Sequence, residues 1–212
     1  MKKLIRLSIA LLLITTVTES FAQTFGVKAG LNLSNMLMKD DDGTYSDDFK
    51  MNPGFHIGPT LELPINEMIS FETGLLLSTK GYKETFDGGT NKFNLLYLDI
   101  PLTAKATFDV GGSKIYGIFG PYIGIGISGK AKYEDDGESF EEDINFGSNE
   151  DEDDLKRLDF GLTIGAGMEF NAIQIGLNYG LGLANISPDT SYGNKVNNRV
   201  LGISLGYKFG GK

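Results

Sequence analysis

The chain has 212 residues, of which 29 are glycine, one is histidine and none is cysteine or tryptophan. A chain without cysteine forms neither disulfides nor thiolate metal sites. The formal net charge of −9 argues against a nucleic-acid-binding surface, because phosphate neutralisation needs clustered Lys and Arg. We expect no nucleic acid as a partner and no cofactor.

The N-terminal segment has the features of a secretory signal peptide. Basic residues precede a short apolar run at 7–17, and Ser20 and Ala22 are the small residues expected before a cleavage point. The apolar run is shorter than the roughly 20 residues that a membrane-spanning helix needs. We predict a cleaved signal peptide at 1–22 and a single domain at 23–212.

The domain is dominated by alternating apolar and polar residues, which is the period-2 pattern of β-strands. Strands of ten or more residues exceed the usual soluble strand of about five or six residues, and they have the length of a tilted strand that crosses a bilayer. The pattern predicts eight strands, at residues 24–34, 54–63, 69–80, 94–108, 114–129, 158–170, 173–183 and 198–209.

The two faces of these strands differ in chemistry. One parity is apolar, with Arg199 as its charged member at a strand end, and the other carries most of the strand glycines and charges. A membrane barrel turns its apolar face to lipid, whereas a soluble lipocalin-like barrel turns it inward around a ligand. Glycines suit a narrow, crowded lumen. The membrane barrel is therefore favoured, and a secreted soluble barrel with an apolar ligand is the alternative.

The ends of the strands support the same interpretation. Aromatic residues near strand ends fit an interfacial girdle, namely Phe25, Phe71, Phe108, Phe170, Tyr207 and Phe209. The predicted connections have about 19, 5, 13, 5, 28, 2 and 14 residues, so long and short ones alternate. Outer-membrane barrels alternate short periplasmic turns with long extracellular loops. We predict an all-β, eight-stranded, antiparallel up-and-down transmembrane β-barrel in the outer membrane, with both termini periplasmic.

Several strands also resemble a known family. The resemblance is carried by Tyr97-Leu98-Asp99-Ile100-Pro101-Leu102, Gly120-Pro121-Tyr122-Ile123-Gly124, Asp159-Phe160-Gly161-Leu162 and the terminal Gly206-Tyr207-Lys208-Phe209. These segments resemble the outer-membrane β-barrel domain common in Bacteroidota, often labelled porin-family or PorT-like. The resemblance covers essentially all of the mature chain and implies a Gram-negative cell envelope protein. It names no activity, and an eight-stranded interior is only wide enough to be filled by side chains.

Six inward charges are predicted near the periplasmic end of the lumen. An unpaired buried charge is far costlier than a paired one, so three cations and three carboxylates should neutralise one another as a structural plug. The functional alternative is a narrow proton or ion path. The six residues are Lys28, Glu62, Glu72, Lys105, Glu169 and Lys208.

His56 is expected to point into the outer half of the lumen, near Asp99 and Asp159. A hydrogen-bonded structural histidine is the favoured interpretation. A Ser-His-acid hydrolase on the barrel wall is the alternative, although no nucleophile signature accompanies it. Pro59 and Pro121 lie within predicted strands, and because proline gives a strand ladder no donor, we expect bulges there.

Carboxylates cluster in two of the predicted outward loops. Twelve of them lie between residues 134 and 154, and their mutual repulsion predicts a mobile, solvated loop. The pattern lacks the alternating ligands and closing Glu of an EF-hand, so we expect weak divalent-cation binding and no specific metal site. The residues chosen for it are Asp40, Asp41, Asp42, Asp135, Asp136, Asp151, Asp153 and Asp154.

The sequence thus predicts a non-enzymatic integral outer-membrane protein whose long acidic loops serve surface interaction or envelope maintenance. Expected partners are outer-membrane lipid and lipopolysaccharide, whose phosphates Arg199 would pair with, the outer-membrane assembly machinery, and an extracellular or envelope protein. The alternatives are a narrow pore or solute conduit, a component of protein secretion, and a barrel-embedded lipid hydrolase.

Overall fold

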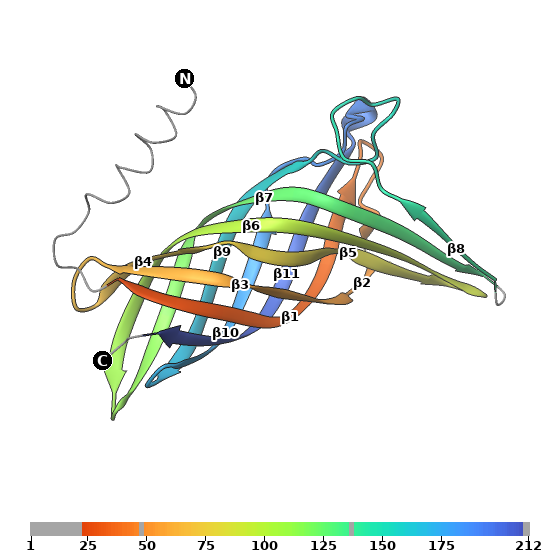
Figure 1. Ribbon diagram of the computed structural model, residues 1–212. Coiled ribbons are helices and arrows are strands. Elements are labelled where there is room, and N and C mark those ends of the chain that lie inside the picture. The colour runs from red at the N-terminus through yellow and green to blue at the C-terminus, as the bar shows by residue number, and fades with distance from the viewer. Residues whose placement is uncertain (1–22, 47–48, 136–137, 210–212) are drawn as a thin grey trace, which may run out of the picture.

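The computed structural model describes residues 23–46, 49–135 and 138–209, so the predicted signal peptide lies outside the described residues. Within them, the chain folds as an antiparallel β-barrel (Figure 1). Its elements are β1 (Thr24–Lys39), β2 (Phe49–Lys50), β3 (Asn52–Pro64), β4 (Ile69–Gly74), β5 (Leu76–Phe86), β6 (Gly89–Val110), β7 (Ser113–Asp135), β8 (Glu138–Asp143), β9 (Leu158–Phe170), β10 (Ile173–Gly182), a 3-10 turn η2 (Ser191–Gly193) and β11 (Lys195–Phe209). No helix in this part of the chain is long and apolar enough to span a membrane.

Eight wall strands form the ring. β1 pairs with β3. The next wall strand consists of β4 and β5 together, and β6, β7, β9, β10 and β11 follow in chain order. β11 pairs with β1 from Phe209 opposite Phe25 to Lys195 opposite Lys39, which closes the ring. Closure pairs the wall's backbone groups, which hydrocarbon could not solvate. The predicted eight-stranded up-and-down barrel is confirmed.

β4 and β5 are separated at Leu75, which lies opposite Pro59 of the neighbouring strand β3. The carbonyl of Pro59 accepts a hydrogen bond of 3.1 Å from the amide of Leu75, but a proline has no amide to return one. The register nevertheless continues unbroken on both sides of this point. Pro121 also pairs in regular register, with Leu162. The bulges predicted at the two prolines are therefore wrong.

A bulge lies in β7 instead. The register between β6 and β7 shifts between Leu96 and Tyr97, which leaves Ile127 of β7 without a partner. One extra residue exchanges the inward and outward positions of the strand beyond it. Gly129, which has the apolar parity in the sequence, is consequently buried.

The apolar parity faces outward and the charged parity faces the lumen, as predicted. Leu31, Phe119 and Ile164 have exposed fractions of 62%, 58% and 60%, whereas Lys105 and Asp159 have 0%. A lipocalin-like barrel would have the opposite polarity. The interior is therefore the polar part of this molecule.

The two ends of the barrel differ in their connections. One end, called the turn end here, contains the first and last residues of the barrel wall and the connections 65–68, 111–112 and 171–172. The other, called the loop end, contains the connections at 40–46, 87–88, 144–157 and 183–194 and the short strand β2. The 13-residue connection predicted between the third and fourth strands is wrong. β5 and β6 continue as a hairpin until only Asp87 and Gly88 separate them, and Gly88 adopts φ of +93°.

A sheet formed by β2 and β8 with the ends of β5, β6 and β7 extends beyond the wall at the loop end, toward the right of Figure 1. β8 pairs with β7 from Asp143 opposite Lys130 to Glu138 opposite Asp135. The described part of the acidic connection therefore includes a strand, which the prediction of a mobile, solvated loop did not include, although the residues of β8 are solvent-exposed. Charge counting overlooked that its apolar residues, among them Phe146, pack against the end of the barrel.

Candidate functional site

Lys105 of β6 is the centre of a buried ion-pair network in the turn-end half of the lumen. Its Nζ lies 3.0 Å from Oε2 of Glu62 and 3.7 Å from Oε2 of Glu72. The same ammonium pairs with Glu169 of β9 and lies 4.6 Å from the ring centroid of Tyr116. One lysine thus joins carboxylates from three other wall strands.

Two further lysines complete this network. Lys28 of β1 donates to Glu72 at 2.5 Å. Lys208 of β11 lies 3.0 Å from Glu62 and 3.1 Å from Glu169. The structure therefore brings together all six lumen charges selected from the sequence. Three ammonium groups face three carboxylates, so the network is neutral as a whole and its charges offset one another's desolvation.

Uncharged residues also belong to the network. Ser70 donates to Glu62 at 2.9 Å, and Gln174 donates to Glu169 at 2.7 Å. These donors satisfy carboxylate lone pairs that the lysines leave open. Both residues have the lumen parity in the sequence, which was the available signal, but a selection based on charge passed over them.

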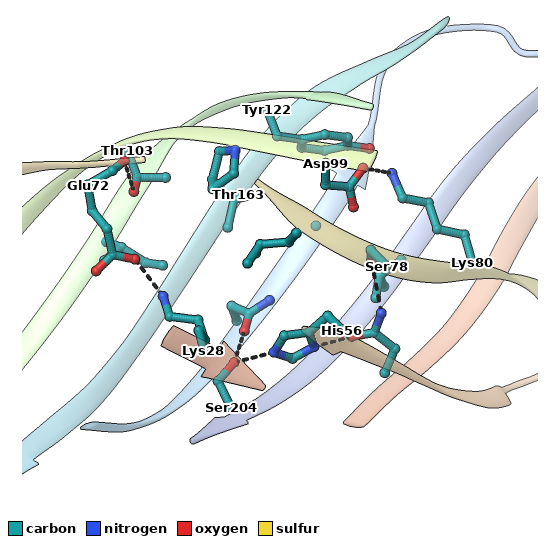
Figure 2. A pocket seen from close by; sticks show the side chains of 17 residues that line it. Lys28, His56, Glu72, Ser78, Lys80, Asp99, Thr103, Tyr122, Thr163 and Ser204 are labelled. Carbon is teal, nitrogen blue, oxygen red and sulfur yellow. Dashed lines mark hydrogen bonds and ion pairs between the residues drawn. The ribbon is translucent and has the colours of Figure 1, made fainter. Parts of the chain in front are cut away.

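A second ion-pair cluster surrounds Lys80 of β5, nearer the loop end (Figure 2). Its Nζ lies 2.8 Å from Oδ1 of Asp99 and 2.9 Å from Oδ2 of Asp159. The ammonium also lies over the rings of Tyr97 and Tyr122, 4.5 Å from the centroid of each. The sequence placed Lys80 on the lumen face without identifying it as the partner of both aspartates.

His56 lines the same cavity as Asp99, but it hydrogen-bonds to neither Asp99 nor Asp159, because Lys80 pairs with both aspartates. Its Nδ1 lies 2.7 Å from Oδ1 of Asn32, and its Nε2 lies 2.9 Å from Oγ of Ser204 (Figure 2). The imidazole is thus held by side chains of β1 and β11.

Gly30 is the reason that His56 reaches β11. Gly30 of β1 is opposite His56 on one side and opposite Ser204 on the other. A Cβ at Gly30 would lie 2.5 Å from Cε1 of His56. The imidazole therefore passes over a position that has no side chain.

The chain from Ser204 through His56 to Asn32 has the order of a hydrolase triad. With the ring proton on Nδ1, Nε2 would accept a hydrogen bond from the hydroxyl of Ser204. That hydroxyl also lies 3.1 Å from Oδ1 of Asn178, and Ser204 is only 7% exposed. The arrangement satisfies buried polar groups and presents no open nucleophile to lipid.

A polar cavity of about 90 Å³ lies between the two ion-pair clusters, and His56 lines it with members of both (Figure 2). A single buried water needs about 10–15 Å³ of such space, so the cavity has room for several waters and is too small for a lipid ester.

Apolar side chains fill the lumen at the loop end. Met36, Leu95, Tyr97 and Ile186 are each at most 2% exposed and belong to one buried cluster. Phe146, from the acidic connection, meets the ring of Tyr97 edge-on with the centroids 5.8 Å apart. Ion pairs therefore occupy the lumen from its turn end to the level of Lys80, and an apolar cluster packs nearer the loop end.

The carboxylates at 40–42 lie in a tight turn. The hydroxyl of Tyr45 donates to Asp40 at 2.9 Å, and the amides of Asp42 and Gly43 donate to it at 2.8 and 3.0 Å. Although desolvation acts to raise it, the pKa of Asp40 lies below its usual 3.8 because these three donors stabilise the carboxylate. The hydrogen bond to Asp40 in turn raises the pKa of Tyr45 above 10.0. Asp41 is exposed in the same turn.

The carboxylates of the acidic connection are spread along it. Asp153 and Asp154 each accept a backbone amide at 2.8 Å, from Asn149 and Asn145. Asp135 ends β7 and Asp151 lies in an exposed turn, while Asp136 lies outside the described residues. Within the described residues, no three His, Asp or Glu side chains are grouped so that they could hold a metal ion.

Known outer-membrane proteins have similar structures. They include the attachment invasion locus protein Ail of Yersinia pestis, at 19% identity, with 88% of this chain and 98% of that chain covered and a TM-score of 0.40. Neisserial surface protein A has 16% identity, with 87% of this chain and 97% of that chain covered and a TM-score of 0.43. The outer membrane protein OprG of Pseudomonas aeruginosa has 15% identity, with 89% of this chain and 97% of that chain covered and a TM-score of 0.46. Among curated proteins, no sequence matches this chain significantly.

The sequence itself shows the family. Residues 21–188, most of the chain, match the outer membrane protein beta-barrel domain. This match agrees with the closed ring of eight wall strands and with its outward apolar face. The chain belongs to the outer membrane protein β-barrel domain family, and it is an integral protein of the outer membrane.

Proposed function

We propose that this protein is a non-enzymatic outer-membrane scaffold whose loop-end sheet serves surface interaction or envelope maintenance. In this proposal the turn end and both termini face the periplasm, and the loop end faces the cell exterior. The two- to four-residue connections at the turn end support this orientation, because periplasmic turns of such barrels are short.

The buried ion pairs that cross the lumen are the observation that carries the proposal. The side chains of Lys105 and Lys80 have exposed fractions of 0% and 2%, and each is held by at least two carboxylates. Moving such ions apart to open a path would cost several kcal/mol for each unpaired charge. A barrel whose lumen is blocked in this way is suited to support an interaction surface and not to conduct solutes.

The proposed interaction surface is the hairpin of β7 and β8 at the loop end of the barrel. The residues of β8 are all exposed, and Phe140 among them has an exposed fraction of 64%. Glu138, Glu141, Glu142 and Asp143 give the strand an acidic character, so its partner would carry Lys or Arg. Aromatic residues are enriched at protein interfaces relative to the rest of the protein surface.

Capture of partners from intact envelopes tests this function. Wild-type protein is compared with a variant in which Glu138 and Glu141 become Gln, and with a control in which Glu67 and Asp109, at the turn end, become Gln and Asn. Substitution is preferable to deletion of 131–156, because the deletion would remove Phe146 from its contact with Tyr97. Loss of a partner only in the first variant supports the proposal, and identical capture by all three proteins contradicts it.

A narrow ion path is the second candidate, favoured by the 90 Å³ polar cavity and by the two carboxylates that share Lys80. Planar bilayers containing the purified protein distinguish the two. We expect no current above that of protein-free bilayers, for wild type and for a Lys80→Met variant alike. Discrete single-channel steps in the wild type would favour the path.

The finer family assignment also belongs to this proposal. The residues that resemble PorT-like proteins of Bacteroidota support a part in protein secretion as an alternative role. Outer-membrane lipid, lipopolysaccharide and the outer-membrane assembly machinery are the proposed envelope partners. Arg199, which lies at the outward parity near the loop end, would pair with a lipid phosphate, and the exposed carboxylates would bind divalent cations weakly. A lipid hydrolase remains the least favoured alternative, because Ser204 is buried.

A further inference from the structure

A cavity of about 270 Å³ lies at the loop end, separate from the polar cavity of the lumen. Met36 and Met38 of β1 line it together with Tyr82, Phe93 and Tyr133 of the extended sheet. The rings of Tyr82 and Phe93 stack with their centroids 4.6 Å apart. Flexible methionines beside aromatic rings make a wall that adapts to an apolar body.

Three acidic residues, Glu142, Asp143 and Asp154, also line this cavity, and all three are exposed. No Lys or Arg is among its lining residues in the described chain. The lysines of the same hairpin are paired elsewhere: Lys130 lies 3.4 Å from Glu141, and Lys132 lies 2.7 Å from Glu134. The cavity therefore combines an aromatic wall with uncompensated negative charge.

This combination selects one chemical class of ligand. A bare metal ion needs several converging oxygen ligands, and the described residues contain no such group. A neutral apolar molecule would gain no electrostatic attraction from these acidic residues. An organic cation satisfies both features, since aromatic rings attract cations and carboxylates pair with ammonium groups.

We propose that this cavity binds an amphipathic organic cation, an ammonium group carried on an aromatic or branched apolar body. The ammonium lies toward Glu142, Asp143 and Asp154, and the apolar body packs against Met38 and the aromatic wall. The cavity shares Glu142 and Asp143 with the hairpin surface, but titration with a small cation measures its binding separately from ion conduction and from capture of a protein.

Calorimetric titration of the full-length protein in zwitterionic nanodiscs tests the proposal, with empty nanodiscs as the blank. The probes are 2-phenylethylammonium and its neutral counterpart 2-phenylethanol, which differ in the ammonium group. We expect saturable binding of the cation, and affinity for the alcohol weaker by about tenfold or more. Equal affinity for the two probes, or no saturable binding of the cation, overturns the proposal.

Two variants locate the site. The triple variant Glu142→Gln/Asp143→Asn/Asp154→Asn should weaken binding of the cation by about tenfold or more. The control Asp87→Asn/Asp135→Asn/Glu141→Gln removes the same number of charges from the same sheet outside the cavity, and its affinity should stay within about twofold of wild type. Equal losses in the two variants would contradict a defined site.

A cavity-filling variant covers the case in which the triple variant misfolds, because Asp154 also accepts the amide of Asn145. Met38→Trp adds volume at a half-buried lining position and leaves all three carboxylates in place. It should abolish binding of the cation while the circular dichroism spectrum stays that of the wild type. Unchanged affinity in a folded Met38→Trp variant would overturn the proposal.

Discussion

Lys80 of β5 donates a hydrogen bond of 2.9 Å to Asp159 of β9, although two wall strands, β6 and β7, stand between them. Tyr122 and Asn198 donate to the same carboxylate at 3.1 and 3.0 Å. Side chains from β5, β7, β9 and β11 thus meet at one oxygen atom. Such a contact links opposite walls directly, in addition to the ladders that link neighbouring strands.

Replacement of Lys80 by Met should lower the free energy of unfolding by about 3–5 kcal/mol, because it leaves Asp99 and Asp159 buried without their cation. The measurement is urea unfolding in detergent micelles, followed by circular dichroism. The triple variant Lys80→Met/Asp99→Asn/Asp159→Asn should recover most of this loss, since no buried charge then remains. A single variant as stable as the wild type would show that the pair is not formed.

Replacement of Gly30 by Ala should destabilise the barrel by about 1–3 kcal/mol through overpacking. The new methyl group would meet the carbonyl of Ile203 and the ring of His56. It should also move the imidazole resonances of His56 in NMR spectra. Gly43→Ala is the matched control, because nothing lies within 4 Å of a Cβ at that position. Equal stability of the two variants would argue against the passage of His56 over Gly30.

Replacement of His56 by Ala should cost about 1–3 kcal/mol, because it leaves the buried carbonyl of Asn32 and the hydroxyl of Ser204 with one partner fewer. Hydrolysis of phospholipid and p-nitrophenyl esters should be the same for wild type, His56→Ala and Ser204→Ala, at the rate of protein-free micelles. Ester hydrolysis by the wild type that both substitutions abolish would establish the hydrolase instead.

The contact between Tyr45 and Asp40 should depend on pH at the alkaline end. Because the hydrogen bond to Asp40 raises the pKa of Tyr45, the contact is complete below the usual pKa of 10.0 and is lost as the pH rises through the raised value. An NMR titration of ring-labelled tyrosine should show Tyr45 ionising above pH 10.0, and Asp40→Asn should bring it down. A Tyr45 resonance that titrates at the same pH in both proteins would contradict this.

Strand parity was sufficient to predict the wall of the barrel and to place Lys105 in the lumen among five other charges. Side chains two residues apart on a strand point to the same face. Charges such as Glu62 and Glu169 could therefore be assigned to the lumen from the sequence. Parity gives the face and height of a residue only roughly, and it says nothing about which inward side chains meet across the lumen. The pairing of Asp99 with Lys80 rather than with His56 therefore required the structure.

The loop end was less predictable for two physical reasons. The hairpin signal Asp87-Gly88 was present in the sequence, but the residues around it lack the apolar alternation of a lipid-facing strand, because both of their faces leave the bilayer. In the acidic connection, a few apolar residues such as Ile144 and Leu155 decide its packing against the barrel, and their contribution is hidden by the number of charges around them.

The unpartnered Ile127 has a consequence for the exterior of the barrel. Before it, β7 presents Ile123 and Ile125 outward, and beyond it the same strand presents Ser128 and Lys130. The single inserted residue thus changes the outward side chains of β7 from apolar to polar. We expect contact with acyl chains to end, and the polar headgroup layer to begin, at this height on the wall.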